Sequence, residues 1–228
     1  MMPNESRLPG RPTTNVRTAR PALAAVLPAL AAWLLVALPA HADEASQPAP
    51  GVGDVWRFRR VDLWTDRETS RLEYRLVQLT PDRLVFENPA TRRKLYRTRD
   101  GNPCRRPTPG EEQVCAGPFR FPLKVGNRHH YGNFPSSDRQ ARLWADCTVA
   151  ALERVTVPAG DFDTYRIECE GPSTPVSREP LSGRWSEITW YAPAVHWWVK
   201  QIVQHRLWTG HVLDKFALEL VDYRPMEK

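Results

Sequence analysis

The segment from Val155 to Cys169, with the sequence VTVPAGDFDTYRIEC, constrains the fold more than any other part of the chain. Apolar and polar residues alternate on both sides of a Pro-Ala-Gly-Asp turn, and two such runs joined by a short glycine-containing turn are typical of a β-hairpin. Gly160 can adopt a positive φ, and Asp161 can accept the hydrogen bonds of the turn. This segment therefore predicts two adjacent antiparallel strands.

The same alternation recurs through residues 54–226. We expect further strands at residues 55–64, 71–79, 83–87, 94–99, 128–134, 139–157, 184–191, 195–207 and 211–223. None of this part shows an apolar stripe of helical period over three turns, and 22 prolines in the whole sequence oppose long helices. We therefore predict one all-β domain, a strongly curved antiparallel sheet of about ten strands rolled into an open barrel or a sandwich, with little helix outside the leader.

Residues 1–42 have the pattern of a secretory signal peptide. Four arginines precede an apolar run over residues 21–40, which ends in the small-x-small cleavage pattern Ala-His-Ala at Ala42. A membrane-anchoring helix is the alternative, but Pro28 and Pro39 interrupt the run. No later run is long enough to span a membrane, so we expect a periplasmic or secreted protein with no transmembrane segment after cleavage near Ala42.

The chain that follows the leader is only mildly basic. It holds 186 residues, 28 of them basic and 25 acidic, which leaves a net charge of +3. Its basic runs, at residues 57–60, 92–94 and 105–106, are dispersed among acidic residues, whereas a nucleic-acid-binding protein carries a clustered basic face. We expect no nucleic acid partner, and we expect residues 43–53 (DEASQPAPGVG) to form a flexible linker.

An even number of cysteines follows the leader, which in an oxidising compartment predicts two disulfides. Three pairings are possible. We favour Cys104 with Cys115, which closes a proline-rich loop, and Cys147 with Cys169, whose even offset around the hairpin turn places both on one face. A zinc site is the alternative, but the sequence has no C-x-x-C pair and no histidine at ligand spacing from a cysteine.

No motif in the sequence assigns a catalytic residue, a metal site or a cofactor. A serine nucleophile on a Gly-x-Ser-x-Gly turn is missing from the sequence. His205 and His211 bracket a turn at Thr209-Gly210 and could meet across a hairpin, so an envelope hydrolase that uses one of them with a carboxylate is an alternative function.

Tryptophan supplies the strongest candidate for a binding surface. Eight of the nine tryptophans follow the leader, and five of these lie between Trp185 and Trp208. Strand alternation predicts that Trp197 and Trp198 point to opposite faces, one of which is the core. The other face would form an aromatic and basic binding surface, unless the rolled sheet covers both. Its candidate residues are Trp190, Trp198, Lys200, Arg206 and Trp208.

The hairpin V-x-V-P-A-G-x-F-D-T-x-x-I from Val155, the later W-Y-A-P turn at Trp190 and the ending L-V-x-Y at Leu220 resemble a class of uncharacterised exported bacterial envelope proteins. The matching runs span the second half of the chain after the leader. This chain departs from the pattern in its cysteine loop and at His129-His130. The resemblance implies an exported β-sheet domain, distantly like the curved sheets of lipoprotein carriers, and it marks no catalytic residue.

These observations favour a soluble periplasmic, non-enzymatic domain that binds an apolar small molecule or a lipid, or that holds an envelope protein. The hydrolase is one alternative, and a purely structural assembly module is the other.

Overall fold

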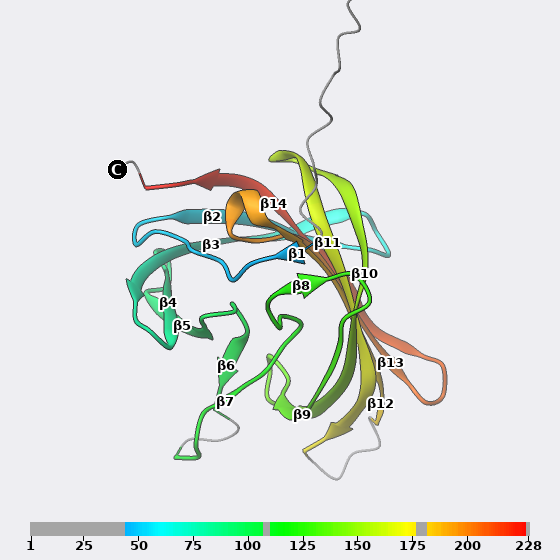
Figure 1. Ribbon diagram of the computed structural model, residues 1–228. Coiled ribbons are helices and arrows are strands. Elements are labelled where there is room, and N and C mark those ends of the chain that lie inside the picture. Colours follow the sequence, from blue (N-terminus) through cyan, green and yellow to red (C-terminus); the bar gives the residue numbers. More distant parts are fainter. Residues whose placement is uncertain (1–43, 107–109, 177–181, 227–228) are drawn as a thin grey trace, which may run out of the picture. The chain divides into compact units, whose positions relative to one another are not determined.

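The structure is a computed structural model that describes residues 44–106, 110–176 and 182–226. The expected signal peptide, residues 1–42, lies outside the described residues. A twelve-stranded antiparallel sheet has the order β7-β6-β5-β4-β3-β2-β14-β13-β12-β11-β10-β9, and a two-stranded sheet joins β1 to β8 (Figure 1). The strands of the large sheet are β2 (Val55–Asp62), β3 (Arg67–Leu79), β4 (Arg83–Asn88), β5 (Arg93–Thr98), β6 (Pro103–Arg105), β7 (Val114–Cys115), β9 (Arg128–Pro135), β10 (Ala141–Val157), β11 (Gly160–Pro175), β12 (Gly183–Ala192), β13 (Trp197–Leu207) and β14 (Val212–Arg224). The small sheet pairs β1 (Glu44–Ala45) with β8 (Leu123–Lys124).

The expected all-β curved sheet is confirmed. Among the described residues the one helical element is a short 3-10 turn, η1 (Pro193–Val195). The hairpin expected around Gly160 joins β10 to β11, with Val157 opposite Gly160 and a φ of 126° at that glycine. Its tip reaches β14, where the Ala159 N–H donates to the Leu220 carbonyl at 3.1 Å.

The large sheet curves until its two edges nearly meet. β-Bulges shift the register between several strand pairs, and each bulge adds the local twist that a large sheet needs in order to roll. Near the edges, Nη1 of Arg105 on β6 donates to the Pro135 carbonyl on β9 at 2.8 Å. Arg142 on β10 and Glu111 in the β6–β7 loop approach within 3.9 Å. The result is a nearly closed, barrel-shaped sheet with an inner and an outer face (Figure 1).

The core of the barrel is an aromatic cluster on the inner face. Trp197 stacks on Phe86 with ring centroids 4.4 Å apart, and it meets Trp56 edge-on at 5.0 Å. Trp198 packs on Phe58 at 4.0 Å. These five rings come from three strands, β2, β4 and β13, and the burial of so much apolar surface stabilises the fold.

The segment expected as a flexible linker packs against the barrel over its described part, from residue 44. Glu44 and Ala45 pair with Lys124 and Leu123, and Ala45 is only 5% exposed. Farther along, Pro48 and Pro50 are buried. Proline and alanine, which in composition resemble a linker, act here as small apolar groups, so the described part of the segment is packed, while the assignment of residues 43–53 as a linker stays a prediction.

A buried carboxylate fixes the end of this segment. Asp54 is 3% exposed and accepts hydrogen bonds from the Gly51 N–H at 2.9 Å, the Met226 N–H at 2.7 Å and the Tyr223 hydroxyl at 3.2 Å. One side chain thus joins the beginning and the end of the β domain. Buried carboxylates need several such donors to offset the loss of hydration.

Both disulfides are present, in the pairing favoured from the spacing. Cys104–Cys115 links the edge strands β6 and β7, and Cys147–Cys169 links opposite positions of β10 and β11. The second pair is almost fully buried. Such bonds are typical of proteins that fold outside the cytoplasm.

Candidate functional site

The structure does not bring the five predicted binding residues together on one exposed face. Trp198 is 3% exposed and pairs with Tyr191, because the register of β12 and β13 shifts between the Trp190–Lys200 and Tyr191–Trp198 pairs. Val199 is the extra residue of this β-bulge, and it turns Trp198 inward together with Trp197. The alternation that placed Trp197 and Trp198 on opposite faces is interrupted at this point.

The other four predicted residues lie at different depths on or near the outer face. Trp190 is 9% exposed, donates from Nε1 to Glu153 at 2.7 Å and lies 5.9 Å from the Lys200 ammonium. Lys200 also pairs with Glu219 at 3.1 Å. Arg206 and Trp208 are exposed near the β13–β14 turn. Trp190 and Lys200 therefore belong to a structural ion-pair network, and their role in binding stays a prediction.

The histidines proposed for a hydrolase are not placed as a catalytic pair. His205 lies on β13 opposite Asp214, and burial lowers the pKa of its imidazole. His211 is exposed in the turn that follows. Within residues 44–106, 110–176 and 182–226, neither ring forms a hydrogen bond with a carboxylate. The described residues also hold no group of three or more potential metal ligands.

Three charged residues that no sequence pattern groups together lie near one another on the inner face. Arg97 on β5 pairs with Leu84 of β4, whose side chain is in the core, so Arg97 faces the same way. Arg105 lies two residues after Pro103, which is paired with Arg97, so Arg105 also faces the same way as Arg97. Glu187 lies between Trp185 and Thr189, which share the inner face of β12. We call Arg97, Arg105 and Glu187 the inner charged cluster.

Each guanidinium of the cluster lies on an aromatic ring and donates to a backbone carbonyl. Arg97 is 4.9 Å from the centroid of Trp197 and donates to the Gly101 carbonyl at 2.8 Å. Arg105 is 4.9 Å from the centroid of Phe134, and it donates to the Pro135 carbonyl at 2.8 Å. Cation–π contact and one hydrogen bond hold each group, which leaves most of its five N–H donors without a protein acceptor in the described residues.

Glu187 is held from its own strand, β12, and from the neighbouring strand, β13. Its Oε1 accepts hydrogen bonds from the Thr189 hydroxyl at 2.7 Å and from Nε2 of Gln201 at 2.6 Å. No ion pair within 4.0 Å joins Glu187 to either arginine among the described residues. The carboxylate and the guanidinium groups therefore face the same interior without neutralising each other by contact.

Burial governs the pKa values of the cluster. It lowers the pKa of Arg97 to about 10 and also lowers the pKa of Arg105, while it raises the pKa of Glu187. The positive charge of Arg105 further lowers the pKa of Arg97, so the two groups are close enough to repel. All three side chains nevertheless keep partial exposure, which means that water reaches this part of the inner face.

Two tyrosines border the cluster. Tyr74 packs against Trp197 with ring centroids 5.5 Å apart, and Tyr131 packs against Phe134 at 6.2 Å. Burial raises the pKa of both phenols, which keeps them protonated as hydrogen-bond donors. Neither hydroxyl has a hydrogen-bond partner among the described residues.

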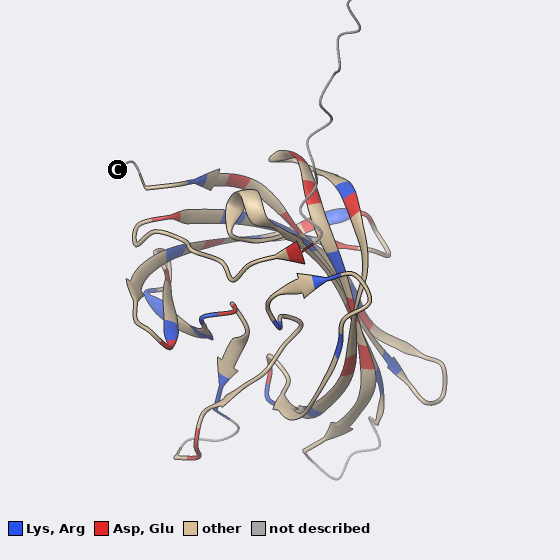
Figure 2. Cartoon of the chain, viewed as in Figure 1, with Lys and Arg blue, Asp and Glu red and all other residues tan. Residues whose placement is uncertain are grey.

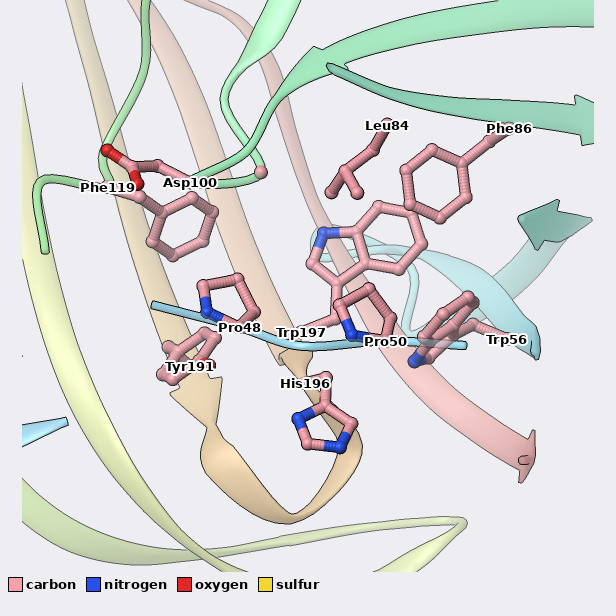
Figure 3. A pocket seen from close by; sticks show the side chains of 11 residues that line it. Pro48, Pro50, Trp56, Leu84, Phe86, Asp100, Phe119, Tyr191, His196 and Trp197 are labelled. Carbon is pink, nitrogen blue, oxygen red and sulfur yellow. The ribbon is translucent and has the colours of Figure 1, made fainter. Parts of the chain in front are cut away.

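A small aromatic pocket lies beside this cluster, under the N-terminal segment (Figure 3). Its cavity measures only about 10 Å³, which is room for one water molecule. Pro48 lies between the rings of Phe119 and Tyr191, and Pro50 lies between those of Trp197 and Trp56, as the labelled side chains show. The aromatic half of the inner face is therefore filled by the protein itself.

A larger cavity of about 220 Å³ lies between the 118–123 loop and the first residues of β9. We call it the loop cavity. It is lined by Pro118, Arg120, Phe121, Pro122, Leu123, Asn127, Arg128, His129 and Val149. Arg120 and Arg128 are exposed at its rim.

Elsewhere, charges of both signs are interspersed along the strands (Figure 2). Arg57 pairs with Glu73 at 2.8 Å and with Asp222 at 2.6 Å across three neighbouring strands. Such pairs cover the outer face and contribute little individually to stability. Within the described ranges, no helix has the length and apolarity that crossing a bilayer requires.

The chain is similar to several solved structures. It is 15% identical to a candidate lipoprotein of Parabacteroides distasonis, covering 80% of this chain and 100% of that one, with a TM-score of 0.44. A candidate exported protein with a YmcC-like fold from Bacteroides fragilis is 13% identical over 79% of this chain and 99% of its own, with a TM-score of 0.42. The hypothetical lipoprotein YmcC of Escherichia coli is 12% identical over 76% of this chain and 85% of its own, with a TM-score of 0.36. No protein-family model and no curated protein matches the chain.

Proposed function

We propose that the protein is an exported, non-enzymatic binding protein whose ligand lies on the inner face of the sheet. The observation that carries this proposal is the inner charged cluster, in which Arg97, Arg105 and Glu187 are surrounded by protein yet keep partial exposure. Burying a charged group costs several kcal/mol unless an opposite charge and hydrogen bonds compensate for its lost hydration. A binding site that becomes complete only with its ligand accounts for this arrangement.

The groups in the cluster suit binding better than proton transfer. Guanidinium groups remain protonated at neutral pH, so they attract and orient a ligand without exchanging protons. Aromatic rings beside them, from Phe134, Tyr131 and Trp185, offer apolar contact within reach of the charged groups. We therefore expect a ligand that has an apolar part and lies near these rings.

Export is the second component of the proposal. The two disulfides favour an oxidising compartment, and the expected signal peptide would direct the chain there. A binding protein in the envelope can hold an apolar molecule that by itself dissolves poorly in water. The curved sheet supplies an inner face that is screened from other envelope components.

A neutral fluorescent probe, N-phenyl-1-naphthylamine, tests binding on the inner face. We expect saturable binding to the purified chain after leader removal, read as a rise and blue shift of probe emission. Val203 lies opposite Glu187 on the inner face, so Val203→Trp should block the site and weaken binding at least tenfold. Gln204→Trp is the matched control, because the neighbouring residue on β13 faces outward.

Folding of both variants is checked by circular dichroism and thermal melting. Val203→Leu, a smaller change at the same position, keeps the test informative where the tryptophan variant does not fold. Equal probe affinity in wild type, Val203→Trp and Gln204→Trp would place binding elsewhere and sink the proposal. A flat titration of the wild type would do the same.

A further inference from the structure

The inner charged cluster is unbalanced in charge. Two guanidinium groups face the interior with one carboxylate, so the cluster carries a net positive charge even with Glu187 ionised. Each arginine has a carbonyl and a ring as its partners, which are neutral groups. A partly enclosed site with net positive charge attracts anions, because a low local dielectric strengthens the attraction.

The hydrogen-bond donors of the site are arranged for an acceptor-rich group. Arg97 and Arg105 retain N–H groups without protein acceptors, and the hydroxyls of Tyr74 and Tyr131 lie beside them among the described residues without hydrogen-bond partners. Carboxylates and phosphates accept several such bonds at once, often from a guanidinium in bidentate geometry. A neutral ligand would leave most of these donors unsatisfied.

Rings line the approach to the donors. Trp197 covers one face of the Arg97 guanidinium, and Phe134 covers one face of the Arg105 guanidinium. Tyr131 continues this apolar surface to Trp185, with centroids 6.5 Å apart. The site therefore combines cationic donors with an adjoining aromatic wall.

We infer that the ligand of the inner face is an anionic amphiphile, whose carboxylate or phosphate binds Arg97 and Arg105 and whose apolar part lies along Tyr131 and Trp185. This inference rests on the proposed function and adds the chemical class of the ligand. Glu187 limits the affinity for the anion, since its charge opposes that of the ligand. Removing an arginine charge should weaken binding of the anion, whereas removing the Glu187 charge should strengthen it. These opposite effects make the assignment testable.

The test compares four probes on the chain after leader removal, by isothermal titration calorimetry and by displacement of N-phenyl-1-naphthylamine. Decanoate and decyl phosphate carry an anionic group, decanol is their neutral counterpart, and inorganic phosphate has no apolar part. We expect both anionic amphiphiles to bind about tenfold or more tightly than decanol, as expected for charge-assisted hydrogen bonds. Weak binding of inorganic phosphate would show that the apolar part is needed.

Substitutions then locate the anionic group. Arg97→Gln and Arg105→Gln should each remove most of the preference for decanoate over decanol, and Glu187→Gln should increase it severalfold. Arg128→Gln, at the loop cavity, is the matched control and should leave the preference unchanged. Arg97→Lys keeps the charge and should restore part of the preference, which separates a charge effect from a folding defect.

The outcomes separate the inference from the proposed function. Equal binding of decanol and decanoate, unchanged in the arginine variants, would overturn the anionic ligand while the inner-face site stands. Loss of the preference in Arg128→Gln alone would move the anion to the loop cavity and overturn the inference. Failure of all amphiphiles and of the fluorescent probe would remove both proposals.

Discussion

At the scale of single residues, Glu187 shows what burial inside the barrel does to the pKa of a carboxylate. Its carboxylate accepts two hydrogen bonds from Thr189 and Gln201, yet burial still raises its pKa above the ordinary value of 4.5. A raised folded-state pKa favours the protonated form, so folding is favoured below the unfolded-state pKa and loses free energy as pH rises through the folded one. Glu187 therefore lowers the stability of the folded protein at neutral pH.

The substitution Glu187→Gln should raise the melting temperature at pH 7, because the amide keeps the acceptor atom without the charge. The gain should shrink as pH falls and vanish below about pH 4, where the wild-type carboxyl is protonated in both states. Melting curves of the two proteins between pH 3.5 and 8 measure the difference. A pH-independent difference would indicate that packing and not charge sets the effect.

At the scale of elements, strand positions could be predicted and strand faces only in part. Alternation over residues 184–191 predicted β12, which extends over Gly183–Ala192. The bulge at Val199 depends on how β13 pairs with β12, and no local pattern reports it. Arg97 and Glu187 lie in strands in which polar and apolar residues alternate, and charged residues in such strands ordinarily face solvent. Their inward orientation therefore follows only from how the sheet closes.

The N-terminal segment is an element whose sequence suggested no structure. Pro50 lies beside Trp56 and Trp197 and Pro48 lines the same pocket, so Pro48→Gly with Pro50→Gly should expose these two tryptophan rings. We expect a red shift of tryptophan emission, faster acrylamide quenching and a loss of about 1–3 kcal/mol of unfolding free energy. Ala49→Gly, at the exposed position between them, controls for added backbone freedom. Spectra identical to that control would mean that the prolines do not shield the rings.

At the scale of the whole molecule, the two disulfides occupy different parts of the sheet. Cys104–Cys115 belongs to its short edge strands and Cys115 is exposed, whereas Cys147–Cys169 is buried within the long hairpin β10–β11. Reductants reach exposed bonds without unfolding the protein, and buried bonds become reactive mainly when the structure opens. The edge of the barrel and its interior should therefore differ in chemical reactivity.

Mild reduction followed by alkylation and peptide mass spectrometry should label Cys104 and Cys115 first. Labelling of Cys147 and Cys169 should be at least tenfold slower and should accelerate in denaturant. The denatured chain serves as the control, because all four cysteines are equally accessible there. Equal labelling rates in the native protein would contradict the burial of the second bond.

The pairing of β14 with β2 also determines when the barrel can form. Arg224 lies opposite Val55, so β2 pairs with a strand that lies far from it in the sequence. Contacts this distant in sequence slow folding, because a long loop must close before they are made. A ribosome or a translocation pore that still holds β14 keeps β2 unpaired on that side. Pairing of β14 with β2 is thus a late step that lets the barrel close.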